Sequence, residues 1–307
     1  MISVGNLTVG GTGKTPLVEH LCLHLARRGA HPCVAMRGYA AGAGVSSDEA
    51  DAFRRAFARA GVAVPVVAQS DRGAGVRALL RGGTNVGVVV LDDGFQHHRL
   101  RRDLDIVLVD ATRPPLADRL LPAGWLREPP GALTRAGAVI VTHAEGVSGP
   151  ALSELERALE SFHGRPVAAV TRHEWTGLDV SGVTEPGSSG AHPVEWLRGK
   201  RVLVVCAIGN PGAFLRAAAL AIGSDPAATM VLRDHHPYDG PTRRRLIAAV
   251  AGMEAILTTD KDWSKLGAHA ASLGCPVARP RLRLAFDRGE DTLLAMAERA
   301  ARVAPVA

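Results

Sequence analysis

Aromatic residues, cysteine and lysine are all scarce in this sequence, and the shortages of aromatic residues and of cysteine each argue against a class of protein. Aromatic side chains account for 4% of the 307 residues and form no stacking pattern typical of RNA-binding modules, and the net charge of +6 is spread over scattered arginines. No apolar run reaches the roughly 18 residues that a membrane-spanning helix requires, and no secretory signal is visible. We therefore expect a globular cytoplasmic protein that binds no nucleic acid.

The four cysteines, Cys22, Cys33, Cys206 and Cys275, lie far apart in the sequence, and no C-x-x-C pair occurs. Such spacing favours neither a zinc site nor a disulfide framework. We expect all four to be small apolar side chains of a protein kept in a reducing compartment.

Lysine occurs at only four positions, and one of them, Lys14, lies in a glycine-rich stretch. Residues 8–15 read TVGGTGKT, directly after a short apolar run and before a helical pattern of apolar residues. This is the usual context of a phosphate-binding loop, in which backbone N–H groups face phosphate oxygens, a lysine neutralises the outer phosphates and a hydroxyl ligates Mg²⁺. Thr8 replaces the first glycine of the common pattern. The stretch predicts nucleotide binding through Lys14 and Thr15, and a glycine-rich turn without a ligand is the structural alternative.

Apolar runs alternate with helical patterns along the first half of the chain. Continuous Val, Ile and Leu runs are typical of a parallel sheet that is covered by helices on both faces. We expect a helix directly after the glycine-rich stretch, strands near residues 33–36, 62–68, 86–91, 105–110 and 138–142, and helices near residues 48–60, 72–81 and 150–163.

A second, smaller series of strands and helices is predicted after a stretch rich in glycine, proline and serine. Its strands lie near residues 201–208, 228–232 and 255–259, and its helices near residues 211–222, 241–250 and 263–273. The extended stretches 166–172 and 276–286 flank this series, and we expect them to pair as a hinge. The predicted fold is α/β, with a P-loop NTPase-like domain over residues 1–172, a linker over 173–200, a smaller α/β domain over 201–285 and a C-terminal helix over 286–307.

A second candidate site element is the apolar run 88–91, which ends in Asp92 and Asp93. The carboxyl end of a parallel strand faces the ligand crevice of such folds, so these carboxylates should lie beside the glycine-rich loop and support Mg²⁺. The alternative is a pair of turn or helix-capping aspartates. The basic run 94–102 that follows could hold phosphate groups or simply face solvent.

Two further acidic and basic pairs have no role that spacing alone defines. Asp48 and Glu49 open a predicted helix, where acidic residues are typical of the first turn. His235 and His236 precede a proline in a loop, and their spacing does not distinguish titration, metal binding and hydrogen bonding.

Taken together, these segments resemble the tetraacyldisaccharide 4′-kinases of lipid A biosynthesis. The DDGFQH string and the threonine that begins the glycine-rich loop are particular to this family, so Thr8 supports the resemblance. The matching stretches occur in the family's order and span nearly the whole chain: residues 4–16, 37–39, 48–49, 92–97, 121–124, 126–128, 208–211, 234–235 and 258–262.

The resemblance implies transfer of the γ-phosphoryl group of ATP, with Mg²⁺, to the 4′-hydroxyl of a tetraacylated glucosamine disaccharide 1-phosphate. It also implies roles for individual residues. Asp48 would take the hydroxyl proton, and His235 would orient Asp48 or raise its basicity. The implied catalytic residues are Asp48, His235, Asp92 and Asp93; the nucleotide-binding residues are Thr8, Gly10, Gly11, Thr12, Gly13, Lys14 and Thr15; the Mg²⁺ ligands are Thr15, Glu49 and Asp92; and Tyr39, Arg72, Gln96 and Arg127 would line the nucleotide or disaccharide site.

Members of this family usually begin with an apolar segment that anchors them at the inner membrane, and the printed sequence has none. Either the chain starts further upstream or its attachment uses another surface. We expect peripheral association with the inner face of the inner membrane through a basic and apolar face near the site, because the acyl chains of the lipid A precursor need an apolar contact. No protein partner is predicted.

Two other functions remain open from the sequence. The first is a P-loop ATPase that acts as a metallochaperone or regulatory switch without a lipid substrate. Such a protein would carry a lysine early in the glycine-rich loop, where this chain has Thr8 and Val9. The second is a nucleic-acid-dependent ATPase, which the net charge alone suggests.

Overall fold

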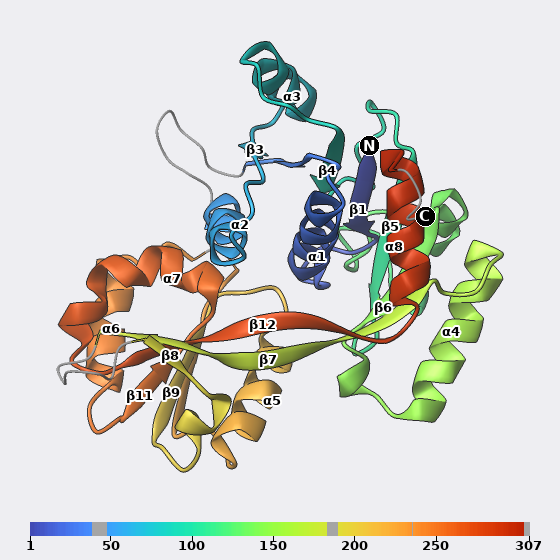
Figure 1. Cartoon of the computed structure of the whole chain (residues 1–307). Coiled ribbons are helices and arrows are strands. Elements are labelled where there is room, and N and C mark those ends of the chain that lie inside the picture. The colour runs from blue at the N-terminus through green and yellow to red at the C-terminus, as the bar shows by residue number, and fades with distance from the viewer. Residues whose placement is uncertain (39–47, 183–189, 235, 304–307) are drawn as a thin grey trace. The chain divides into compact units, whose positions relative to one another are not determined.

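The chain is a mixed α/β protein with a large, mostly parallel sheet and flanking helices (Figure 1). The computed structural model describes residues 1–38, 48–182, 190–234 and 236–303, and only the backbone of Asp48. The chain divides into two compact units, one formed by Met1–His173 and Leu284–Ala307 and the other by Glu174–Arg283.

The first unit contains a parallel sheet in the strand order β3-β2-β4-β1-β5-β6-β7. Because β1 lies between β4 and β5, the loops that follow β1 and β4 leave the carboxyl edge of the sheet side by side. The strands are β1 (Ile2–Asn6), β2 (Pro32–Met36), β3 (Val66–Ala68), β4 (Val88–Asp92), β5 (Leu104–Asp110), β6 (Ala138–Thr142) and β7 (Ala169–Ser181).

Helices cover both faces of this sheet, as the apolar runs predict. Alternate residues of one strand enter opposite cores: Ile106 packs with α1 and α8, and Val107 packs with α4. The last helix of the chain thus lies beside the first (Figure 1). One face carries α1 (Lys14–Arg27), α2 (Asp48–Arg59) and α8 (Glu290–Ala301), and the other carries α3 (Arg72–Arg81), α4 (Gly149–His163) and the short helix η2 (Pro130–Arg135).

The second unit repeats this pattern on a smaller scale. Its strands follow the order β10-β9-β11-β12-β7, and β8 pairs antiparallel with β7. Helix α5 packs on one face, and α6 and α7 pack on the other. The elements are β8 (Gly190–His192), η4 (Val194–Leu197), β9 (Val202–Cys206), α5 (Pro211–Ile222), β10 (Ala228–Val231), α6 (Gly240–Ala249), β11 (Ala255–Leu257), α7 (Asp260–Leu266), η5 (Gly267–Leu273) and β12 (Val277–Arg288).

The segment 173–200, expected as a linker, contains the second half of β7 together with β8 and η4. Leu178 and Val180 are buried in a core with α5, because this part of β7 belongs to the sheet of the second unit. The stretches 166–172 and 276–286, expected to pair, belong largely to β7 and β12, which are neighbours in the sheet.

Two further expectations concern cysteine and membrane spans. All four cysteines are buried and form no disulfide, as their spacing predicts. Over the described part of the chain, we find no helix with the length and apolar character needed to cross a bilayer.

Candidate active site

The glycine-rich loop joins β1 to α1 and takes a shape that requires its glycines. Gly10 and Gly13 have φ angles of 106° and 82°, in the left-handed region that residues with a Cβ rarely adopt. Gly13 immediately precedes α1, and no side chain caps this helix. The N-terminus of α1 therefore presents backbone N–H groups and the positive end of the helix dipole, which is the arrangement that binds phosphate.

A second loop, residues 118–128, holds the glycine-rich loop in place. Val9 donates its backbone N–H to the Trp125 carbonyl at 2.8 Å, and Arg127 donates its own to the Leu7 carbonyl at 2.7 Å. The Arg127 Nε donates to the Thr8 carbonyl at 2.9 Å. These bonds fix the position of the loop before any ligand is bound.

Asn6, the last residue of β1, is the centre of a polar network at this edge of the sheet. Its Oδ1 accepts hydrogen bonds from Lys14 Nζ at 3.0 Å and from the guanidinium of Arg127. Its Nδ2 donates to the Thr8 hydroxyl at 3.2 Å, and its carbonyl accepts from Gln96 Nε2 at 3.0 Å. Asn6 thereby joins the glycine-rich loop to both neighbouring loops.

Asp93 is the anionic member of this network and pairs with its cationic side chains. Arg127 contacts both Asp93 carboxylate oxygens at 2.8 Å, and Lys14 Nζ lies 3.5 Å from Oδ1. Burial alone would raise the pKa of Asp93, but the hydrogen bonds from Arg127 and the charges of Lys14 and Arg72 hold it well below its usual range. Asp93 is thus ionised at neutral pH. The predicted position of the aspartates beside the glycine-rich loop is confirmed for Asp93, which lies 3.5 Å from Lys14.

Asp92 lies in a different environment although it is the next residue in the chain. Its side chain is buried, and its Oδ1 has no hydrogen-bond partner among the described residues. Burial, together with the neighbouring charge of Glu49, raises the pKa of Asp92 to about 7, against the opposing charge of Lys14. A buried carboxylate beside a second carboxylate is costly unless a cation compensates it.

The oxygen donors near Asp92 suit Mg²⁺ in kind, since carboxylates and hydroxyls are the ligands that this ion prefers. Within the described residues, however, no group of three or more His, Cys, Asp or Glu side chains could hold a metal ion. The unpartnered Asp92 Oδ1 therefore fits an ion that takes most of its ligands from phosphate and water, which is the usual way that Mg²⁺ binds in phosphotransfer enzymes.

The remaining predicted residues are placed as follows. Arg72 is buried at the start of α3 and donates from its guanidinium to the Asp93 carbonyl at 3.1 Å, so it supports the turn at Asp93. Tyr39, His235 and the side chain of Asp48 lie outside the described residues. In the basic run 94–102, Arg102 pairs with Asp105 and donates to two backbone carbonyls, so this arginine braces its own loop.

The sequence analysis assigns no role to three residues of this region. Asn6 could have been suspected as a polar residue that ends an otherwise apolar strand. Glu128 accepts hydrogen bonds from Gln96 at 3.0 Å and from Arg135 at 2.7 Å. His173 lies in the first half of β7, and its Nε2 is 2.9 Å from the position that a Cβ on Gly13 would take. No sequence signal points to this residue.

His173, in the first half of β7, packs against His143, a buried residue that directly follows β6. Its ring stands edge-on to that of His143 with 4.2 Å between the centroids, and its backbone N–H donates to Glu145 Oε2 at 3.4 Å. Burial and the neighbouring His143 lower the pKa of His173 to about 3, with Glu145 opposing. His173 is therefore neutral at physiological pH.

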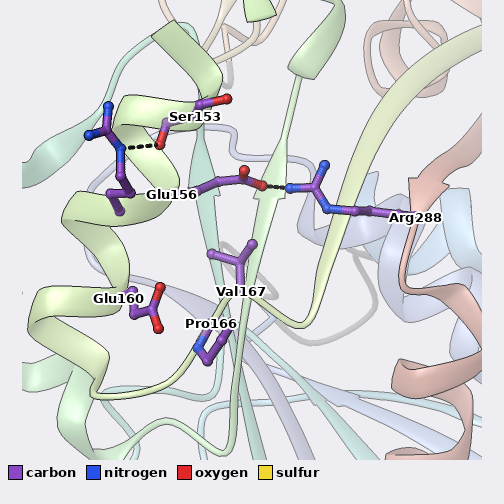
Figure 2. A pocket seen from close by; sticks show the side chains of 7 residues that line it. Ser153, Glu156, Glu160, Pro166, Val167 and Arg288 are labelled. Carbon is purple, nitrogen blue, oxygen red and sulfur yellow. Dashed lines mark hydrogen bonds and ion pairs between the residues drawn. The ribbon is translucent and has the colours of Figure 1, made fainter. Parts of the chain in front are cut away.

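A cavity of about 310 Å³ lies elsewhere in the first unit, against α4 (Figure 2). Figure 2 shows Glu156 paired with Arg288 beside this cavity. Arg157, which also lines it, donates to the Ser153 carbonyl. None of its lining residues belongs to the predicted site.

The chain is similar in sequence and in fold to proteins of one family. A model of the family described as tetraacyldisaccharide-1-P 4′-kinase matches residues 1–298. The tetraacyldisaccharide 4′-kinase of Anaeromyxobacter sp. (strain K) is 37% identical over 321 residues, covering 99% of this chain and 82% of its own. The tetraacyldisaccharide 4′-kinase of Geobacter metallireducens is 40% identical over 290 residues, covering 89% of this chain and 80% of its own. A crystal structure of LpxK from Aquifex aeolicus in complex with ATP is similar with a TM-score of 0.68 and 29% identity, over 97% of this chain and 87% of that one.

Proposed function

Because the chain belongs to the tetraacyldisaccharide-1-P 4′-kinase family, we propose that it transfers the γ-phosphoryl group of ATP to the 4′-hydroxyl of a tetraacylated glucosamine disaccharide 1-phosphate, a step of lipid A biosynthesis. The observation that carries the proposal is the approach of Lys14 to Asp93 at 3.5 Å, which brings the two halves of a phosphotransfer site together. Family membership favours this kinase over the ATPase switch and over the nucleic-acid-dependent ATPase.

We infer that the first unit is a P-loop kinase domain. The strand-loop-helix arrangement of β1, the glycine-rich loop and α1 supports this inference. The second unit would be the smaller α/β domain, and β7 and β12, which carry the chain between the units, would act as the hinge. Kinases of this kind commonly close over ATP, which excludes water that could hydrolyse the nucleotide.

In the proposed site, the phosphates of ATP lie on the backbone N–H groups of residues 8–15 and on Lys14. Lys14 contacts Asn6 and Asp93, and these contacts hold its ammonium group where the outer phosphates of ATP would bind. Arg127 neutralises Asp93 and holds the Thr8 carbonyl, which keeps the loop in its phosphate-binding shape. Most of the rate acceleration would then come from alignment and charge neutralisation.

Thr15, Glu49 and Asp92 are the residues that would hold Mg²⁺. When bound, the ion neutralises charge that develops on the transferring phosphoryl group. Asp92 supplies the buried, unpartnered oxygen, and Glu49 lies close enough to raise the pKa of Asp92.

In the proposed mechanism, Asp48 and His235 together activate the sugar hydroxyl. Asp48 would accept the hydroxyl proton, and His235 would orient Asp48 or raise its basicity. Tyr39, Arg72, Gln96 and Arg127 would line the nucleotide or disaccharide site. Gln96 is suited to this role because its Oε1 is buried without a partner in the described part of the chain.

A direct test is ATP-dependent phosphorylation of a labelled lipid A precursor, followed by thin-layer separation of the lipids. We expect a new, more polar lipid that requires ATP and Mg²⁺. Lys14→Ala should abolish it, because the outer phosphates lose their point charge. Lys200→Ala is the matched control, since Lys200 contacts the Trp196 ring in the second unit and should leave turnover unchanged. Release of phosphate without a new lipid would contradict the proposal and favour the ATPase switch.

The proposed location is the cytoplasmic face of the inner membrane, with peripheral attachment. A substrate with four acyl chains is confined to a lipid phase, whereas ATP is dissolved in the cytoplasm. The enzyme must therefore work at the boundary between the two.

A further inference from the structure

Three large apolar side chains are exposed within six residues of one loop. Leu120, Leu121 and Trp125 have 48%, 50% and 48% of their surface exposed. The other large exposed apolar side chains of the described residues are dispersed over both units, namely Leu80, Phe162, Leu220, Val231, Ile247 and Leu282. Single exposed apolar residues are ordinary, but a cluster of this kind marks a surface that binds a partner.

The loop that carries this cluster is braced internally, so the exposed side chains are not the result of a loosely packed segment. Leu121 donates its N–H to the Leu126 carbonyl at 2.8 Å, and Leu126 donates to the Arg119 carbonyl at 3.0 Å. A side chain on Gly124 would begin 2.3 Å from the Arg119 carbonyl oxygen, so the turn closes tightly on itself. Leu126 is buried in the core beneath it.

The charged groups beside the cluster are cationic. The guanidinium of Arg113 lies over the Trp125 ring, 3.8 Å from its centroid, and Arg113 and Arg119 are both exposed. The one acidic residue of the segment 118–126, Asp118, accepts hydrogen bonds from the backbone N–H groups of Arg119 and Trp125 at 2.7 and 3.2 Å. Leucines, a tryptophan and arginines together suit the boundary between acyl chains and anionic headgroups.

The cluster is also continuous with the candidate active site. The Trp125 carbonyl accepts the N–H of Val9 in the glycine-rich loop, and Arg127, two residues further on, contacts Asp93. All of these residues belong to the first unit. A bilayer against this loop would present a lipid directly beside the phosphate-binding residues.

We propose that residues 118–126 dock on the surface of an anionic lipid bilayer. Leu120, Leu121 and Trp125 enter the region between headgroups and acyl chains, and Arg113 and Arg119 contact the headgroup phosphates. The choice of a bilayer as the partner rests on the proposed function, because a lipid kinase must take its substrate from a membrane. The inference goes beyond that function by naming the surface of attachment.

Flotation of the 307-residue chain with vesicles of phosphatidylethanolamine and phosphatidylglycerol tests the proposal without any substrate. We expect Leu120→Gln/Leu121→Gln to weaken vesicle binding by about tenfold or more, because two apolar side chains no longer enter the bilayer. The matched control is Leu220→Gln/Ile247→Gln, which removes two exposed apolar side chains from the second unit and should bind as the parent does. Arg119→Glu should also weaken binding to these anionic vesicles. On vesicles of phosphatidylcholine alone, which carry no net charge, the variant and the parent chain should bind equally.

A second measurement does not depend on how well the double variant folds. Brominated lipids should quench part of the tryptophan fluorescence of the parent chain, and Trp125→Phe should lose that part while retaining vesicle binding. Equal quenching in Trp125→Phe, equal binding of the two double variants, or no binding of the parent chain would each overturn the proposal.

Phosphorylation of detergent-dispersed precursor separates this proposal from the proposed function. Leu120→Gln/Leu121→Gln should retain turnover in detergent and lose it on vesicles. A parent chain that binds vesicles through this loop but phosphorylates no lipid would leave the docking surface standing and remove the kinase.

Discussion

Arg127 joins segments that the sequence separates by more than a hundred residues. It donates to Thr8 and Asn6 on one side, 119 and 121 positions away, and to Asp93 on the other. Its planar guanidinium can make these contacts together because its donors point in fixed, divergent directions. One side chain thus sets the spacing between the glycine-rich loop and the turn after β4.

Replacing Arg127 by lysine should keep the charge and lose the geometry. A single ammonium cannot contact both Asp93 oxygens and the Thr8 carbonyl, so we expect kcat/KM for lipid phosphorylation to fall by about a hundredfold. Arg54→Lys is the control, because Arg54 forms an exposed pair with Asp51 on α2. Near-normal turnover of Arg127→Lys would mean that charge alone suffices at this position.

Asp92 should show a conflict between stability and activity. Asp92→Asn removes a buried charge beside Glu49, so the free energy of unfolding without ligand should rise by about 1 kcal/mol, while lipid phosphorylation is lost. Addition of MgATP should raise the Tm of the parent chain and should raise that of the variant much less. Thermal unfolding with and without MgATP measures both effects. An equal MgATP-dependent rise in the two proteins would exclude Asp92 from the metal site.

His173 should make the folded chain sensitive to mild acid. Its pKa of about 3 in the folded state lies below the value of about 6.5 in an unfolded chain, so the unfolded state binds more protons between these values. The contribution of His173 to the free energy of unfolding is therefore fully present above about pH 6.5. It decreases as the pH is lowered, by at most about 1.4 kcal/mol per pH unit.

Urea unfolding of His173→Gln at a series of pH values tests this assignment. The variant should lose less stability than the parent between about pH 6.5 and roughly pH 4. His98→Gln, which changes an exposed histidine, should follow the parent curve. A parallel fall in His173→Gln would place the acid sensitivity at another group.

Elements with their own start and stop signals could be predicted from the sequence to the residue. Helix α3 follows Asp71, which accepts the N–H of Ala74, and α5 follows Asn210 with proline as its first residue. Their boundaries, 72–81 and 211–222, agree with the structure. The sequence predicts a linker over the second half of β7, because glycines are frequent there. Pairing with β8 and packing with α5 make this segment a strand.

In the candidate site, too, residues within local sequence motifs are predictable, and residues that matter through tertiary contacts are harder to predict. Lys14, Asp92 and Asp93 are predictable because they end or follow single apolar strands in a known pattern. Asn6 also ends an apolar strand, but its importance, like that of Glu128, comes from contacts with residues far away in the chain. Sequence patterns report local structure and motifs, whereas hydrogen-bond networks depend on how the loops meet.

Helix α8 should contribute strongly to the stability of the first unit although it is the last element of the chain. Leu293 is fully buried in the core that α1 and the sheet share. Leu293→Ala should lower the free energy of unfolding by about 2–4 kcal/mol, because it leaves a cavity in this core. Chemical denaturation gives the value. Thr292→Ala, at the exposed neighbouring position, should change it by less than about 0.5 kcal/mol.

At the scale of the whole molecule, the two units are joined by β7 and β12 rather than by a single crossing of the chain. Ion pairs connect these strands along their length: Arg172 with Asp287, Arg281 with Asp179, and Arg283 with Glu174. If these strands act as the proposed hinge, two neighbouring strands would allow less relative motion than a flexible linker and would guide closure along a limited path.

Asp48 and His235 belong to different units, and kinetics can decide if they act as one catalytic group. If His235 acts only through Asp48, Asp48→Ala should lower kcat strongly and the double variant should be no slower than Asp48→Ala alone. His235→Ala combined with Asp51→Ala is the control cycle, since Asp51 is paired with Arg54 on α2 and its effect should multiply independently. Losses that multiply in the Asp48–His235 cycle would show that each residue serves a separate step, and the proposed division of labour across the two units would then be wrong.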